Sequence, residues 1–274
     1  MGIEVGVMFW AAPDAAATIA GVKALGVNCG QLGVTGEFAL SGAGPIWKAA
    51  LDAAGFRLST VFAAYTGEDY ADIPTVERTV GFIPESTRAE REQRTYAISD
   101  FAAALGVKSI ACHVGFVPED KSHPNYVAVR DLVRRICDYA AKHGQSFVLE
   151  TGQEPAHTLL AFFSDVERSN LGINFDPANM ILYGTGDPIE ALGVLGKNVI
   201  SVHAKDGDWP PKDKPGSLGT ERPLGQGSVG MERFVAKLKE IGYSGQVNVE
   251  REGTNPDVWR TDVAAAVKLL NGLI

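Results

Sequence analysis

One unit recurs along the chain: a stretch rich in alanine and leucine ends at a glycine, and a short run with β-branched residues follows within a few positions. Clear copies are “DAAGFRLSTVFAAY” from residue 52 and “AALGVKSIACHVG” from residue 103. A glycine at this point suits the left-handed residue that commonly closes a helix. The unit therefore predicts a helix, a glycine cap and a strand. Its six glycines are Gly26, Gly55, Gly106, Gly144, Gly196 and Gly242.

The repeated unit predicts about eight strands separated by amphipathic helices. The strands are expected near 4–10, 27–32, 58–65, 109–115, 146–152, 171–177, 199–205 and 246–252. Strict alternation of strands and helices implies parallel pairing with right-handed crossovers. We therefore predict an α/β fold, a single (β/α)₈ TIM barrel in one domain over 1–274, with a doubly wound open sheet as the alternative. Two connections, 66–88 and 207–227, are long, and long loops in compact domains are often functional.

Alternation within the strands separates an apolar face from a polar one, because successive side chains of a strand point to opposite sides. In “VISVHAKD”, the seventh run, Val202 and Ala204 share one face, while His203 and Lys205 share the other. The same split recurs in the other runs, where a polar group ends the inward set. Barrel enzymes build their sites at this carboxyl end of the strands.

Four inward side chains are therefore expected to converge at the barrel mouth: Glu150, Asp176, His203 and Glu250. Three carboxylates held together repel one another and raise each other's pKa unless a positive charge lies between them. A divalent cation resolves that conflict. Oxygen ligands with one imidazole suit Mn²⁺, our first choice, with Mg²⁺, Co²⁺ and Zn²⁺ as alternatives.

Three further residues are candidates for substrate contact. His113 ends the inward set of the fourth strand, and its alternative role is a hydrogen bond to a neighbouring loop. Lys205 follows His203 with inward parity, and its alternative role is a structural ion pair with Asp206. Trp10 ends the first strand with inward parity and is expected to form an apolar wall of the pocket.

Several motifs occur in order at strand spacing and together resemble a known family. They are “LETG” at 149–152, “NFDPAN” at 174–179, “VHAKD” at 202–206, “PLGQG” at 223–227 and “VNVERE” at 247–252. This pattern is similar to the sugar phosphate isomerase/epimerase superfamily of xylose-isomerase-like TIM barrels, which includes the ketose 3-epimerases. The resemblance covers most of the chain and is strongest from about 109 to 253.

The resemblance implies one divalent metal held by Glu, Asp, His and Glu, which map onto the same four residues. It also implies that Glu150 and Glu250 are the catalytic acid and base on opposite faces of the sugar. Arg222, just before “PLGQG”, is implied to hold substrate. The ketose 3-epimerases carry a histidine shortly after the aspartate ligand, where this chain has Asn179.

The function expected from these residues is a divalent-metal-dependent sugar isomerase or epimerase. It would abstract a proton next to a carbonyl and pass through a metal-bound enediolate. An alternative with the same metal site is a dehydratase or lyase acting on keto-inositols or 3-keto-glycosides. An alternative of another class is a non-catalytic carbohydrate-binding barrel, which would need no paired carboxylates as bases.

Composition restricts the partners. Lys and Arg total 25 against 33 Asp and Glu, which gives a formal net charge of −8. This argues against nucleic acid as a partner, because a protein surface that binds nucleic acid needs a basic stripe. We expect no membrane span, export signal or lipid anchor, because no apolar run approaches about 20 residues and no basic segment precedes the first strand. Three cysteines without a CxxC pair favour a cytoplasmic protein. The expected partner is a small sugar or keto-polyol, and assembly into a homo-oligomer is left open.

Overall fold

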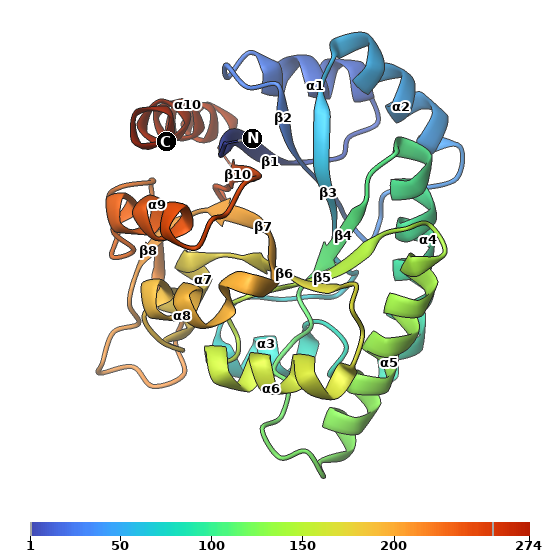
Figure 1. Cartoon of the computed structure of the whole chain (residues 1–274), viewed down its shortest axis with the longest axis vertical. Helices are drawn as coiled ribbons and strands as arrows, with labels where there is room; N and C mark the ends of the chain where they lie inside the picture. Colours follow the sequence, from blue (N-terminus) through green and yellow to red (C-terminus); the bar gives the residue numbers. More distant parts are fainter. Residues whose placement is uncertain (1, 254) are drawn as a thin grey trace.

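Eight parallel strands close into a barrel in the computed structural model, which describes residues 2–253 and 255–274. Strand β1 pairs with β2 on one side and with β10 on the other, so the sheet has no open edge and the open-sheet alternative is wrong. The predicted TIM barrel is confirmed (Figure 1). In order around the barrel the strands are β1 (Glu4–Trp10), β10 (Gln246–Val249), β7 (Val199–Ala204), β6 (Leu171–Phe175), β5 (Ser146–Glu150), β4 (Ser109–Cys112), β3 (Arg57–Ala63) and β2 (Cys29–Val34).

Helices form an outer ring around the strands (Figure 1). Aspartates at the N-caps of several helices accept backbone N–H groups of the first turn, as Asp14 does from Ala17 at 2.9 Å. The helices are α1 (Ala15–Lys23), α2 (Ala43–Ala54), α3 (Ile73–Thr79), α4 (Glu85–Leu105), α5 (Pro124–Ala141), α6 (Ala156–Val166), α7 (Pro177–Tyr183), α8 (Pro188–Leu195), α9 (Met231–Glu240) and α10 (Pro256–Leu273).

Two structural requirements explain the glycines of the repeated unit: a positive φ at five positions and close packing at the sixth. Five of the six have a positive φ, as predicted for residues that close helices, and Gly106 after α4 is typical with φ 78°. The prediction is wrong for Gly196, whose φ is −50°. A Cβ at Gly196 would lie 3.0 Å from Ile241 Cδ1, so close packing of the chain on Ile241 explains this glycine instead.

The two faces of the strands pack as their alternation predicted. Outward side chains such as Val7 and Phe175 join the large core between the strands and the helices. Inside the barrel, Met8, Phe62 and Val148 belong to a small apolar cluster. Other inward positions carry buried polar side chains, among them Gln31, Thr60, Asn174, Ser201, His203 and Asn248. The last four of these lie on the neighbouring strands β6, β7 and β10.

Both long connections contain regular structure. Residues 66–88 include α3 and the start of α4, and residues 207–227 lie largely in a hairpin of β8 (Asp206–Asp208) and β9 (Thr220–Arg222). The buried carboxylate of Asp206 fixes the following “PLGQG” segment by accepting N–H groups from Gly207, Gly225, Gly227 and Val229. A Cβ at Gly227 would collide with that carboxylate, which explains this glycine.

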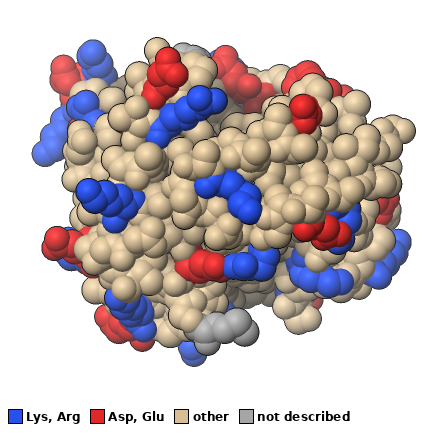
Figure 2. All heavy atoms as spheres, turned by 90° about the horizontal axis from the view of Figure 1, so that it is seen from above, with Lys and Arg blue, Asp and Glu red and all other residues tan. Residues whose placement is uncertain are grey.

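The surface carries both signs of charge. Figure 2 shows acidic and basic side chains interspersed on the face that it presents, without a continuous basic patch there. Across the described part of the chain, the helices are all too short or too polar to cross a membrane.

Candidate metal centre and active site

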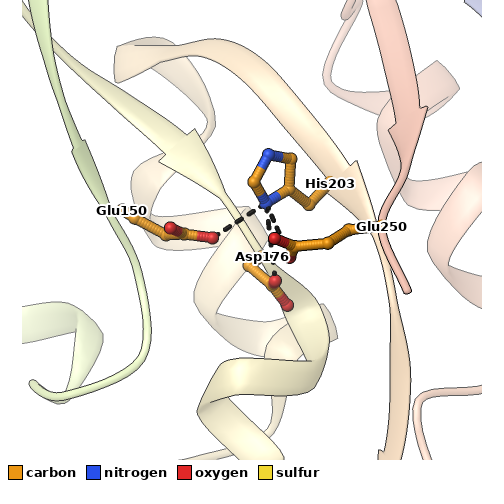
Figure 3. A group of neighbouring side chains, drawn as sticks. All are labelled: Glu150, Asp176, His203 and Glu250. Atoms are coloured by element: carbon orange, nitrogen blue, oxygen red, sulfur yellow. Dashed lines mark hydrogen bonds and ion pairs between the residues drawn. The ribbon is translucent and has the colours of Figure 1, made fainter. Parts of the chain in front are cut away.

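Glu150, Asp176, His203 and Glu250 meet at the carboxyl ends of four strands that are neighbours in the barrel. Glu150 is the last residue of β5, Asp176 directly follows β6, His203 lies near the end of β7, and Glu250 directly follows β10. One donor atom from each residue lies within 4.8 Å of the others, and the four side chains point toward a common centre (Figure 3). The convergence expected from strand parity is therefore present, and the role of these residues as ligands stays a prediction.

His203 turns its Nδ1 atom toward the carboxylates. This atom lies 2.8 Å from Glu150 Oε1, 3.0 Å from Glu250 Oε2 and 3.6 Å from Asp176 Oδ2 (Figure 3). The other ring nitrogen, Nε2, lies 2.9 Å from Oε1 of Gln31 on β2. If Nε2–H donates to Gln31, the tautomer leaves Nδ1 free to bind a cation.

The unused donor atoms of this cluster fit a divalent cation. Asp176 Oδ2 and Glu250 Oε2 are buried and accept no hydrogen bond from the described residues, and their contacts to His203 and Lys205 are ion pairs only. The other oxygen of Asp176 accepts the N–H of Asn179 at 2.9 Å and caps α7, so the carboxylate is fixed with one oxygen toward the cluster. Carboxylate oxygens with one imidazole nitrogen match the donor set of Mn²⁺, Mg²⁺ and related ions.

The charges of the cluster shift one another's pKa values. Burial raises the pKa of Asp176 to about 6. Burial would lower the pKa of His203, but the carboxylates of Glu250 and Glu150 outweigh it and hold that pKa well above its usual value. Burial would raise the pKa of Glu250, but the charges of His203 and Lys205 hold it well below. The carboxylates thus require a positive charge at their centre. It comes either from the extra proton on His203 or from a metal cation that takes the place of that proton.

Lys205 lies beside the cluster, fully buried. Its ammonium lies 3.4 Å from Glu250 Oε2 and pairs also with Glu252. Burial would lower the pKa of Lys205, but these two carboxylates hold it well above its usual value. The alternative of an ion pair with Asp206 is wrong, because Asp206 accepts backbone N–H groups instead.

A cavity of about 870 Å³ opens beside the cluster. Glu250, His113 and Trp10 are among the residues that line it, which agrees with the predicted positions of His113 and Trp10. His113 Nε2 lies 3.0 Å from Glu150 Oε2, and its ring packs edge-on against Phe62. A role of these residues in binding substrate stays a prediction.

Asn179 also lines the cavity, at the position where ketose 3-epimerases are expected to carry a histidine. Its Nδ2 donates to Glu150 Oε1 at 3.3 Å, and its Oδ1 accepts from Lys205 at 3.4 Å. The departure from the epimerase pattern therefore lies where substrate would bind.

The guanidinium of Arg222 pairs with Asp208 across the β8–β9 hairpin at 2.6 Å and lies outside the described lining of the cavity. Substrate binding by Arg222 stays a prediction. Two other arginines line the cavity, Arg251 directly after β10 and Arg260 on α10, and Arg251 pairs with Glu221 at 2.8 Å. The sequence reasoning missed Arg251 and also Gln31, whose signal was a polar side chain of inward parity within the apolar run “CGQLGV”.

The chain matches the xylose isomerase-like TIM barrel family over residues 19–270 and belongs to that family. Among curated proteins it is 30% identical over 158 residues to inosose isomerase of Bacillus subtilis, covering 53% of this chain and 54% of that protein. The chain thus spans about half the length of the curated relatives it matches.

Solved structures share the whole fold. A xylose isomerase domain protein from Planctomyces limnophilus is 43% identical, with a TM-score of 0.93, over 100% of this chain and 98% of that chain. The D-allulose 3-epimerase from Methylomonas sp. is 18% identical, with a TM-score of 0.72, over 100% of this chain and 98% of that chain. At that identity the epimerase shows likeness of fold alone.

Proposed function

We propose that this protein is a divalent-metal-dependent isomerase or epimerase that moves a proton next to the carbonyl of a small sugar or keto-polyol. The observation that carries the proposal is the placement of Glu150 and Glu250 on either side of the His203 Nδ1 atom (Figure 3). A large cavity lies beside them. A barrel that only binds carbohydrate has no need of two carboxylates opposed in this way, one buried and one partly buried. The match to the xylose isomerase-like TIM barrel family and the 30% identity to inosose isomerase over about half of each chain support the same conclusion.

Each residue has a distinct task in this reaction. A divalent cation held by the four ligands, Mn²⁺ in our proposal, would supply Lewis-acid stabilisation of negative charge on the substrate oxygen, worth several kcal/mol. One of the two glutamates removes the carbon-bound proton, and the other returns a proton from the opposite face. Lys205, held beside Glu250, compensates its negative charge. His113, within 3.0 Å of Glu150, is placed to contact a substrate hydroxyl.

The proposed location is the cytoplasm. All three cysteines are buried and unpaired, as in proteins of reducing compartments. Burial also raises the pKa of the Cys29 thiol to about 12, which keeps it protonated and unreactive.

Solvent deuterium exchange with the metal-loaded protein tests the proposed reaction. We expect deuterium to enter carbon positions next to the carbonyl of at least one member of a panel of ketoses and inososes. Glu150→Gln and Glu250→Gln should each retain metal with modestly reduced affinity, since an amide oxygen replaces a carboxylate oxygen. Turnover should fall about 10²- to 10⁴-fold, the contribution of a positioned general base.

The control is Glu240→Gln, which removes an exposed carboxylate of α9 that pairs with Lys237. It should leave metal content and exchange unchanged. Near-normal turnover in both metal-loaded cluster variants would contradict the two-base reaction. An absence of exchange with every ketone in the panel would favour the binding barrel, and an unsaturated product would show elimination in place of epimerisation.

A further inference from the structure

The cavity beside the metal cluster continues well beyond it. From Glu250 and Asn179 it passes Trp10 and reaches helices α1 and α10. These helices are neighbours in the outer ring, since they follow the paired strands β1 and β10 (Figure 1). We call this extension the α1–α10 groove, lined by Trp10, Thr18, Gly21, Trp259 and Arg260.

Helix packing leaves the groove open. Helix α1 packs closely against α2, while α10 packs against β1 and β10. At the groove, α1 carries Gly21, and a Cβ built there would meet nothing within 4 Å. Space is therefore available between the two helices at this point.

Two indole rings supply the recognition surface of the groove. The ring of Trp10 lies over Gly33 on β2, where a Cβ would come within 2.5 Å of it, and 47% of Trp10 remains exposed. The ring of Trp259 is half-buried and is oriented by its Nε1–H, which donates to the carbonyl of Arg251 at 3.0 Å. Both rings are thus held by contacts away from the groove, and flat apolar faces of this kind bind other flat rings.

The size of the cavity also favours a ligand that extends from the cluster into the groove. Its volume of about 870 Å³ lies toward the upper end of the roughly 300–1,000 Å³ in which proteins bury drug-sized ligands. A single six-carbon sugar at the cluster is much smaller than a drug-sized ligand and would leave the α1–α10 groove to water.

We propose that the substrate has two parts: a polyol or keto part at the metal cluster, and a flat ring substituent in the α1–α10 groove. The substituent is a second sugar ring or an aromatic aglycone, since both present a flat face to an indole. The substrate class is thus a glycoside or a similarly substituted sugar. The inference depends on the proposed function only in that the first part lies at the cluster.

Calorimetric titration of the Mn²⁺-loaded protein without turnover tests the groove. Lactulose is compared with D-fructose for a second sugar ring, and phenyl β-D-glucoside with methyl β-D-glucoside for an aromatic ring. We expect about tenfold tighter binding of the larger member of at least one pair. A gain in the first pair alone identifies a sugar substituent, and a gain in the second pair alone identifies an aromatic one.

Gly21→Leu should fill the groove from α1 and abolish this gain, while metal content and binding of the smaller probes stay unchanged. Trp259→Leu should reduce the gain by removing one ring face. The matched control is Gly272→Leu, a helical glycine of α10 with nothing within 4 Å of a built Cβ and outside the cavity lining. It should keep the full gain.

Equal affinities within both pairs would overturn the proposal, as would a Gly21→Leu variant that keeps the gain or weakens both members of a pair equally. The result is separable from that of the proposed function. If the larger probe binds more tightly but no tested ketone exchanges deuterium, the isomerase function is refuted and the binding of a ring in the α1–α10 groove stands. If a ketone exchanges deuterium but the larger probes bind no more tightly, the isomerase function stands and the two-part substrate is refuted.

Discussion

At the scale of single residues, the orientation of His203 is decided from the far side of the barrel. Gln31 on β2 is fully buried, and its Oε1 lies 2.9 Å from His203 Nε2. The amide nitrogen of Gln31 donates to Asn174 at 3.0 Å, and Ser201 donates to the same Asn174 oxygen. A buried network of this kind fixes an imidazole ring only if each of its members is satisfied.

Gln31→Leu should therefore weaken divalent-metal binding about 10- to 100-fold, the usual effect of losing the partner that orients a ligand histidine. Gln31→Glu should recover most of the affinity, because it restores an acceptor for Nε2–H. Ser201→Ala is the control, since it disturbs the same network without touching His203. Competition against a metallochromic chelator measures all four proteins, and a leucine variant with unchanged affinity would refute the role of Gln31.

At the scale of elements, loops at the barrel mouth are held by single buried carboxylates. Asp206 holds the segment after β9. Glu154, which follows β5, accepts the N–H of Val117 at 2.8 Å and joins the loops that follow β4 and β5. Next to it, Gln153 lies 3.2 Å from the ring of His113. The position of the candidate substrate-binding histidine thus depends on how well Glu154 fixes this loop.

Stability should depend on pH through Glu154, because burial raises its pKa to about 8 from 4.5. The folded state favours the protonated acid, so this group's contribution to stability is complete below about pH 4.5 and is lost as the pH rises through 8. Between these limits the stability of the natural protein relative to Glu154→Gln should fall by about 1.4 kcal/mol for each pH unit. Urea unfolding from pH 5 to 9 measures it, with Glu119→Gln as the control for net charge. A difference in unfolding free energy between the natural protein and Glu154→Gln that does not vary with pH would refute the raised pKa of Glu154.

Sequence patterns predicted the helices and strands that are marked by residues within the element itself or directly next to it. The eight strands were predicted within a few residues because alternation of period two repeats in each, and helices with glycine caps separate them. Helix α3 and the β8–β9 hairpin escaped prediction because they are short and depend on distant contacts, such as those that Asp206 makes to residues about 20 positions away. The ion pair of Arg222 with Asp208 escaped for the same reason, since it needs the hairpin register.

At the scale of the whole molecule, the cluster joins four of the eight strands. Sequence parity could place Glu150, Asp176, His203 and Glu250 at the same end of the barrel, because the strand ends of a closed parallel sheet lie together. Parity marks Gln31 as a polar side chain inside the barrel, but it could not indicate the contact of Gln31 with His203, which crosses the barrel between β2 and β7. Nor could it show the extent of the cavity, which depends on how α1 and α10 pack.

A cation that binds these four side chains only in the folded barrel should stabilise the whole fold. At a concentration 100 times the dissociation constant the gain is about 2.7 kcal/mol, which for a domain of this size raises Tm by roughly 5–10 °C. Asp176→Asn should lose most of this response to Mn²⁺ while keeping the cap of α7, because the amide oxygen still accepts from Asn179. Asp187→Asn makes the matched change at the cap of α8, away from the cluster, and should respond like the natural protein. Thermal unfolding with and without Mn²⁺ compares the three, and an equal shift in both variants would show that the ion acts elsewhere.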